Sequence, residues 1–223
     1  MRTEEEKIEK QRESWDARQG VYGNSLRSVL FKNLPSSLNN RLHQKHVDFV
    51  LKSLPECQGS LLDVGCGYGR MSAEVQRHKP SMTFEGVEIC AEFADKFRQD
   101  LGDCYHGSAV SYVPSAQFDV VLMVTILMYQ TPETFSEFLH KYWQSVKVGG
   151  VLICVEPYRN MLVRYRQYNA SEPQTEHYFE RNQLKVLLSA LPNSSVTCHQ
   201  QFGLLPLVNQ PVLHHGITVY KES

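Results

Sequence analysis

The sequence predicts an α/β protein built on a doubly wound, Rossmann-like sheet. From residue 60 to about residue 155, short apolar runs alternate with helical patterns, as in a parallel sheet covered by helices on both faces. A glycine-rich turn, Gly65–Gly69, follows the first apolar run, and the acid Glu88 ends the second. Two last strands form an antiparallel hairpin at the edge of the sheet, which brings the predicted number of strands to seven.

An N-terminal helical segment, residues 1–54, is predicted to precede the main domain, residues 55–223. Residues 4–18 are charged and helix-prone, and they are too polar to form a core unaided. A serine at 36–37 caps a second helix that runs to about residue 52. The chain is therefore expected to fold as a single α/β domain with a helical appendage.

The main domain alternates strand and helix in a regular order. The predicted strands span residues 60–64, 82–87, 103–107, 118–124 and 151–155, and the helices between them span residues 70–78, 91–100 and about 132–146. A helix at about 177–190 precedes the final strands, 195–202 and 213–220. Side chains alternate along a strand, so His214 and His215 should point to opposite faces of an edge strand.

The bulk properties exclude several classes of protein. The formal net charge is −1, which gives no electrostatic reason to expect a nucleic acid or a membrane surface as partner. No apolar run reaches the length of about 20 residues that a membrane span needs. The six cysteines include no C-x-x-C pair, which favours buried thiols in a reducing compartment. We expect a cytoplasmic protein that is a monomer or a homodimer.

The strongest functional signal is the turn between the first strand and the first helix of the main domain. Gly65, Gly67 and Gly69 alternate there, so the ligand can lie directly against the backbone. This G-x-G-x-G spacing differs from the G-x-G-x-x-G of dinucleotide sites, and it favours a cofactor with a cationic amino-acid tail. Glu88, at the tip of the second strand, can accept both hydroxyls of a ribose that lies across the turn.

Four motifs in order then carry a family resemblance. They are Asp-Val-Gly-Cys-Gly-Tyr-Gly at 63–69, Val-Glu at 87–88, Gln-Phe-Asp-Val-Val at 117–121 and Val-Lys-Val-Gly-Gly-Val-Leu at 146–152. Over residues 55–157 the chain resembles the class I S-adenosylmethionine-dependent methyltransferases. The resemblance implies a seven-stranded sheet whose last strand is antiparallel, with S-adenosylmethionine as cofactor and S-adenosylhomocysteine as product.

The resemblance also implies roles for individual residues. Asp63, Gly65 and Gly67 would line the methionine part of the cofactor, with Cys66 contributing backbone. Glu88 would bind the ribose. The adenine would be contacted by Ile89, Ser108 and Ala109, and the methionine chain and sulfonium by Val124 and Thr125. N-terminal segments in this superfamily often act as lids, so Tyr22 could close over the cofactor.

The sequence identifies the acceptor site less specifically than the cofactor site. The acceptor site is expected in residues 15–46 and 157–180, where His43, His46 and His177 are candidate bases and Tyr22 is a further candidate catalytic residue. No paired acids follow the fourth and fifth strands, so we predict no metal. The Asn/Asp-Pro-Pro-aromatic motif of enzymes that methylate nucleic-acid bases is missing after the fourth strand. The sequence Glu156-Pro157-Tyr158 is more simply interpreted as the opening of a loop.

The leading hypothesis is therefore methyl transfer to a nitrogen or oxygen of a small-molecule acceptor. One alternative is a protein N-terminal methyltransferase, which would need an acidic groove for a cationic peptide. Another is a catalytically silent partner subunit that only binds the cofactor.

Overall fold

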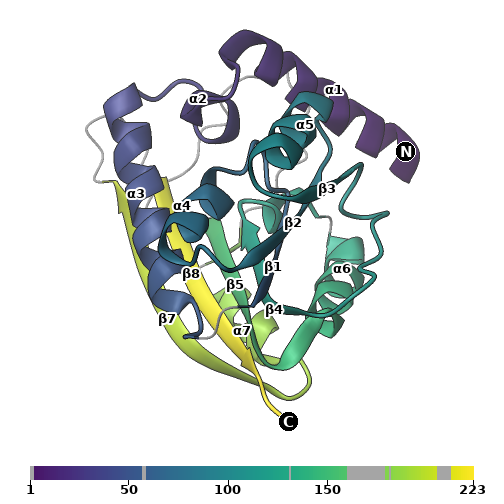
Figure 1. The fold of residues 1–223 in the computed structure, drawn as a ribbon, viewed down its shortest axis with the longest axis vertical. Coiled ribbons are helices and arrows are strands. Elements are labelled where there is room, and N and C mark those ends of the chain that lie inside the picture. Colours follow the sequence, from purple (N-terminus) through teal and green to yellow (C-terminus); the bar gives the residue numbers. More distant parts are fainter. Residues whose placement is uncertain (1–2, 57–58, 131, 160–178, 181, 205–211) are drawn as a thin grey trace.

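A computed structural model describes residues 3–56, 59–130, 132–159, 179–180, 182–204 and 212–223. Seven strands follow one another across the sheet in the order β3-β2-β1-β4-β5-β8-β7, and β6 pairs with β5 off this path (Figure 1). The strands are β1 Ser60–Val64, β2 Thr83–Glu88, β3 Asp103–His106, β4 Phe118–Val124, β5 Val146–Arg159, β6 Phe179–Glu180, β7 Ser194–Leu204 and β8 Val212–Lys221.

The last strand is antiparallel to its neighbours, as predicted. Strands β1 to β5 pair in parallel, whereas β8 runs antiparallel to both β5 and β7. The expectation that His214 and His215 lie on an edge strand is wrong, because β8 is inserted between β5 and β7. Both imidazoles are buried as a result.

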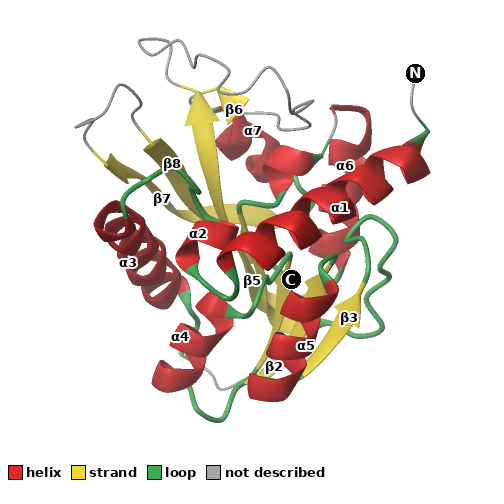
Figure 2. Ribbon diagram, turned by 90° about the horizontal axis from the view of Figure 1, so that it is seen from above, coloured by secondary structure: helices red, strands yellow, loops and turns green. Residues whose placement is uncertain are grey.

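Helices cover both faces of the sheet (Figure 2). They are α1 Glu4–Tyr22, α2 Leu26–Val29, α3 Ser36–Ser53, α4 Arg70–His78, α5 Ala91–Asp100, α6 Pro132–Gln144 and α7 Gln183–Ser189, with a single 3₁₀ turn, η1, at Leu127–Tyr129. Apolar side chains of α3, α4 and α5 pack on one face, and those of α6 and α7 pack on the other. This is the two-faced covering that alternating strands and helices predict. No helix among the described residues is long and apolar enough to cross a membrane.

Two predicted elements differ from the structure. Strand 151–155 is only the middle of β5, which extends to Arg159, so Glu156 lies inside a strand and does not open a loop. The helix predicted at 177–190 is wrong at residues 179–180, which form β6, and its described helical part begins at Gln183. In both places pairing with a neighbouring strand decides the local structure, and a local pattern does not contain that information.

The N-terminal helix α1 is polar on all sides, and none of its 19 residues is buried. Thr3 and Glu6 form a capping box at its start, and Gly23, with φ 58°, ends it. The Arg18 guanidinium donates to the backbone carbonyls of Arg27 and Leu30, which ties α1 to the segment around α2. Helix α1 lies across the top of the molecule beside α5 and α2 (Figure 1).

Candidate functional site

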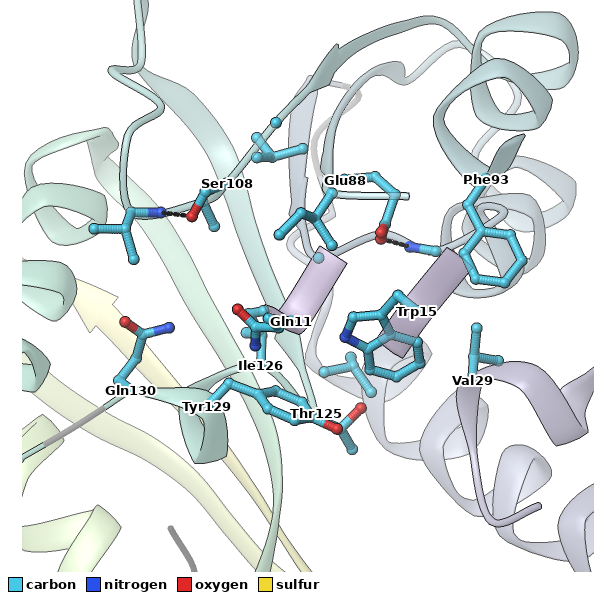
Figure 3. Close-up of a pocket in the computed structure, with 18 residues that line it drawn as sticks. Gln11, Trp15, Val29, Glu88, Phe93, Ser108, Thr125, Ile126, Tyr129 and Gln130 are labelled. Atoms are coloured by element: carbon cyan, nitrogen blue, oxygen red, sulfur yellow. Dashed lines mark hydrogen bonds between the residues drawn. The ribbon is translucent and has the colours of Figure 1, made fainter. Parts of the chain in front are cut away.

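A cavity opens at the carboxyl ends of β1, β2 and β4, beneath α1. Parallel sheets bind ligands at this edge, next to the strand where the order reverses, which here is β1. Residues from the turn after β1, the ends of β2 and β4, and helix α1 form its walls (Figure 3). The site is therefore assembled from segments more than 100 residues apart in sequence.

The floor of the cavity is the glycine turn. Gly65 and Gly67 have φ angles of 71° and 57°, in a region that residues other than glycine rarely adopt. The backbone N–H groups of Gly65 and Cys66 both donate to the carbonyl of Val87, at 2.8 and 3.1 Å. A Cβ atom at Gly65 would lie 2.8 Å from Cδ1 of Ile126. The turn is thus held against β2 and leaves only backbone facing a ligand.

Glu88 lies at the end of β2 and is 6% exposed. Its two carboxylate oxygens accept backbone hydrogen bonds from Gly67 and Cys90, each at 2.8 Å. Burial raises the pKa of Glu88 to about 7, and the backbone hydrogen bonds oppose this rise. Each carboxylate oxygen has two acceptor positions, so one on each oxygen is left for a ligand.

Asp63 and Cys66 lie behind the turn and do not line the cavity. The Asp63 carboxylate is 2% exposed and accepts a hydrogen bond from the Ser72 hydroxyl at 2.7 Å, and burial raises its pKa to about 6. The Cys66 thiol is buried, with its Sγ 3.8 Å from Sγ of Cys104. Asp63 therefore links β1 to α4. Cys66 contributes only its backbone to the turn.

One side of the cavity is formed after β2 and β3. Ile89, Ser108 and Ala109 line it, together with Phe93 and Val110. The Ser108 hydroxyl accepts a hydrogen bond from the backbone N–H of Val110 at 3.1 Å, which shapes the loop locally. Apart from Ser108 this wall is apolar, which suits packing against an aromatic base.

The opposite side is formed by the end of β4 and by α1. Val124 and Thr125 line it, and Thr125 has the unusual φ of 59° for a residue with a branched side chain. Trp15 of α1 meets Tyr129 edge to face, with ring centroids 5.9 Å apart (Figure 3). Gln11 lies one helical turn before Trp15, so both side chains lie on the face of α1 that covers the cavity.

The comparisons with known proteins bear on the family. A family model described as a methyltransferase domain matches residues 61–150, which include the glycine turn and Glu88. This match and the similar solved structures support the class I S-adenosylmethionine-dependent methyltransferase superfamily. No curated protein matches the sequence of this methyltransferase significantly.

Solved structures resemble this methyltransferase over nearly its whole length. A Leishmania major SAM-dependent methyltransferase gives a TM-score of 0.71 at 14% identity, covering 96% of this chain and 82% of that one. The 1,6-didemethyltoxoflavin-N1-methyltransferase of Burkholderia thailandensis gives 0.66 at 16% identity, covering 100% and 92%. DhpI, in complex with SAH, gives 0.64 at 18% identity, covering 99% of both chains. At these identities the likeness is one of fold.

The candidate bases His43 and His46 lie away from the cavity of the methyltransferase, between α3 and α4. The Arg70 guanidinium bonds to Nδ1 of His43 at 3.0 Å and to Nδ1 of His46 at 3.3 Å. Burial lowers the pKa of His43 to about 4 and that of His46 well below its ordinary value, and the nearby Arg70 charge adds to both shifts. Both imidazoles are therefore neutral partners of a buried arginine.

Of the other two catalytic candidates, Tyr22 lies away from the cavity and His177 cannot be placed. Tyr22 ends α1 and is not among the residues that line it, while Trp15, two turns earlier, is. His177 lies outside the described residues. Within the part of the chain that the structure describes, one group has the spacing of metal ligands, Asp16, Cys90 and Glu92, and it lies outside the cavity. The prediction of a metal-free site stays a prediction.

Sequence reasoning did not assign several lining residues to the site: Gln11, Val29, Phe93, Val110, Ile126, Tyr129 and Gln130. A signal existed for Gln11, because it lies four residues before Trp15 in a predicted helix. Tyr129 and Gln130 follow a strand end that the sequence did identify.

Proposed function

We propose that the chain moves the methyl group of S-adenosylmethionine to a nitrogen or oxygen atom of a small-molecule metabolite and releases S-adenosylhomocysteine. The observation that carries the proposal is the lining of the cavity. It combines the glycine turn and the Glu88 carboxylate with the uncharged side chains of Trp15, Tyr129, Gln11 and Gln130. The turn and the carboxylate suit an amino-acid nucleoside, and the uncharged side chains suit a compact neutral acceptor.

In this proposal each predicted cofactor residue contacts a particular part of S-adenosylmethionine. Glu88 accepts the two ribose hydroxyls with the acceptor positions that Gly67 and Cys90 leave free. Gly65 and Gly67 admit the methionine part against their backbone. Ile89, Ser108 and Ala109 contact the adenine, and Val124 and Thr125 lie under the sulfonium. Asp63 and Cys66 act from behind the turn.

The bound cofactor would supply an electrophilic methyl group on a sulfonium. The chain's own task is then to orient the acceptor and exclude water. Trp15 and Tyr129 close the cavity from two different segments, and they present uncharged walls. Orientation of this kind accounts for up to about 7–11 kcal/mol of a reaction barrier. Neutral walls suit a reaction in which the positive charge at sulfur disappears.

The charge of the cavity favours a small neutral acceptor over a cationic peptide. Among the described residues that line it, Glu88 is the single charged side chain, and backbone N–H groups already bind both of its oxygens. An N-terminal amine would need free carboxylates. The Burkholderia enzyme with bound 1,6-didemethyltoxoflavin offers a precedent for a small acceptor on this fold.

The test separates the three hypotheses. The protein is incubated with methyl-labelled S-adenosylmethionine and, separately, with a low-mass metabolite extract and a peptide library. We expect label in low-mass products alone, and no label with the Glu88→Ala variant. Label on peptide N-termini would instead support the N-terminal methyltransferase. Cofactor binding by calorimetry without any turnover would support the silent subunit.

A further inference from the structure

Glu156 is a fully buried carboxylate that the proposed reaction does not yet use. It is 0% exposed and lies near the end of β5, directly after Val155, which pairs with Val124 of β4. The Thr125 N–H donates to the carbonyl of Val155 at 2.8 Å, so Glu156 lies beside the point where the chain leaves β4. Four of the residues that follow, Thr125, Ile126, Tyr129 and Gln130, line the cavity.

The carboxylate of Glu156 binds three successive backbone N–H groups. Oε1 accepts from Ile126 and Leu127, each at 2.8 Å, and Oε2 accepts from Met128 at 3.3 Å. These N–H groups stand at the start of the 3₁₀ turn η1, where no backbone acceptor is available within the turn. Glu156 thus serves as a cap supplied by a different strand.

The segment that Glu156 caps, residues 125–130, contributes to three parts of the site. Thr125 lies at the proposed sulfonium position, and Ile126 packs on the glycine turn so closely that a Cβ at Gly65 would lie 2.8 Å away. Tyr129 meets Trp15 of α1 (Figure 3). One carboxylate therefore fixes the backbone that joins the cofactor floor to the acceptor wall and the covering helix.

The backbone at residues 125–128 needs both oxygens of a carboxyl group at position 156. Thr125 holds a positive φ of 59°, which is unfavourable for a β-branched residue unless its surroundings enforce it. A glutamine at 156 has one acceptor oxygen, and its NH₂ group would face an N–H donor. At least one of the three backbone donors would then be left buried without a partner, and the turn would shift to regain one.

We propose that Glu156 is a positioning residue for the proposed methyl transfer: its three backbone hydrogen bonds hold residues 125–130 in the conformation that seats Tyr129 against Trp15 and aligns the acceptor. This inference rests on the proposed function. It differs from a general role in folding, because it assigns Glu156 to one segment of the cavity wall. Displacement of a reacting group by about 1 Å can lower a rate by about 10²-fold.

The test uses Glu156→Gln and Glu156→Asp in the full chain, with Glu85→Gln as matched control. Glu85 also lies on a strand, and its carboxylate accepts a hydrogen bond from the Tyr112 hydroxyl, outside the cavity. The first readout is acrylamide quenching of tryptophan fluorescence without acceptor. Of the two tryptophans, Trp143 is 1% exposed, so quenching reports mainly on Trp15.

We expect Glu156→Gln to raise the quenching constant at least twofold and to lower kcat by about tenfold to 10²-fold. Glu156→Asp keeps both carboxyl oxygens with a shorter reach, so its quenching and kcat should lie between those of the wild type and the glutamine variant. Glu85→Gln should change neither quantity. If Glu156→Gln does not fold, the aspartate variant is judged by the same two quantities against Glu85→Gln.

Unchanged quenching in a folded Glu156→Gln protein, or an equal change in Glu85→Gln, would overturn the positioning role. The quenching measurement needs no acceptor and no turnover. A wild-type protein that fails to bind S-adenosylmethionine would instead overturn the proposed function, and the quenching result would still decide whether Glu156 fixes the segment. The two failures are therefore distinguishable.

Discussion

Replacing Glu88 with glutamine keeps the shape of the side chain and removes one acceptor oxygen. In the structure the two oxygens of Glu88 each accept one backbone hydrogen bond, from Gly67 and from Cys90, at 2.8 Å. The remaining acceptor position on each oxygen is available to one ribose hydroxyl. The glutamine therefore loses one ligand contact and also turns an NH₂ group toward a backbone donor.

The magnitude follows from the loss of one hydrogen bond to a charged group. Such a bond is worth about 1.5–3 kcal/mol, and each 1.4 kcal/mol corresponds to about tenfold in Kd. Glu88→Gln should thus weaken the binding of S-adenosylmethionine by about 10- to 150-fold. Glu88→Ala removes both acceptors and should weaken binding at least as much.

Isothermal titration calorimetry with S-adenosylmethionine and with S-adenosylhomocysteine measures this loss, and circular dichroism checks the fold. Glu85→Gln, on the same strand but outside the cavity, is the control and should bind as the wild type does. An affinity within twofold of the wild type in folded Glu88→Gln would refute the assignment of Glu88 to the ribose.

Three further outcomes are expected. Gly67→Ala should weaken cofactor binding at least tenfold in calorimetry, because residue 67 has φ 57° and the new Cβ would lie 3.0 Å from Val29. The control Gly20→Ala has open space around the new Cβ and should bind the cofactor as the wild type does. Deletion of residues 1–22 should lower turnover at least tenfold and leave circular dichroism of the sheet intact, since α1 buries no residue; retained turnover would contradict a covering role. Burial raises the pKa of Glu88 to about 7, so the acceptor form prevails above that pH, and cofactor affinity should fall on acidification through pH 7 in the wild type but not in Glu88→Gln.

The packing around Leu30 decides where the N-terminal segment should be cut. The sequence suggested a lid in residues 1–54, and a cut after residue 34 would test it. However, Leu30 is 7% exposed and packs with the fully buried Leu42 in a small core cluster. A cut after Tyr22 removes Gln11 and Trp15 from the cavity and leaves that cluster in place. Loss of turnover then reports on the cover and not on a damaged core.

The sequence was sufficient for the parts of the fold that local chemistry decides. The apolar runs at β1, β2 and β4 and the glycines between β1 and α4 are local patterns, and each has the predicted structure. The cover was harder to predict, because α1 is polar on every side and has no apolar periodicity to mark the face with Gln11 and Trp15 that covers the cavity. Glu156 was harder still, because its role depends on the β4 segment that lies beside it in space.

For the histidines, sequence reasoning failed in the opposite way, because it assigned residues to the site that lie elsewhere. Residue type made His43 and His46 candidate bases, but their environment is set by other elements: Arg70 of α4 bonds to both, and His46 also packs against strands more than 150 residues later. His46 is 0% exposed and packs 4.8 Å, ring to ring, from His214 of β8. No local pattern in α3 could reveal that neighbour.

His46→Leu separates a structural role from a catalytic one. Burial holds the pKa of His46 well below its ordinary value, so the imidazole stays neutral at neutral pH, and the residue is absent from the walls of the cavity. The leucine would leave the Arg70 N–H that now meets Nδ1 at 3.3 Å without an acceptor, at a cost of about 1–3 kcal/mol in the free energy of unfolding. We expect a lower denaturant midpoint, with kcat within about threefold of the wild type and an unchanged pH profile, since a residue that transfers no proton sets no pKa in kcat. Loss of the pH dependence with full stability would show that His46 reaches the acceptor after all.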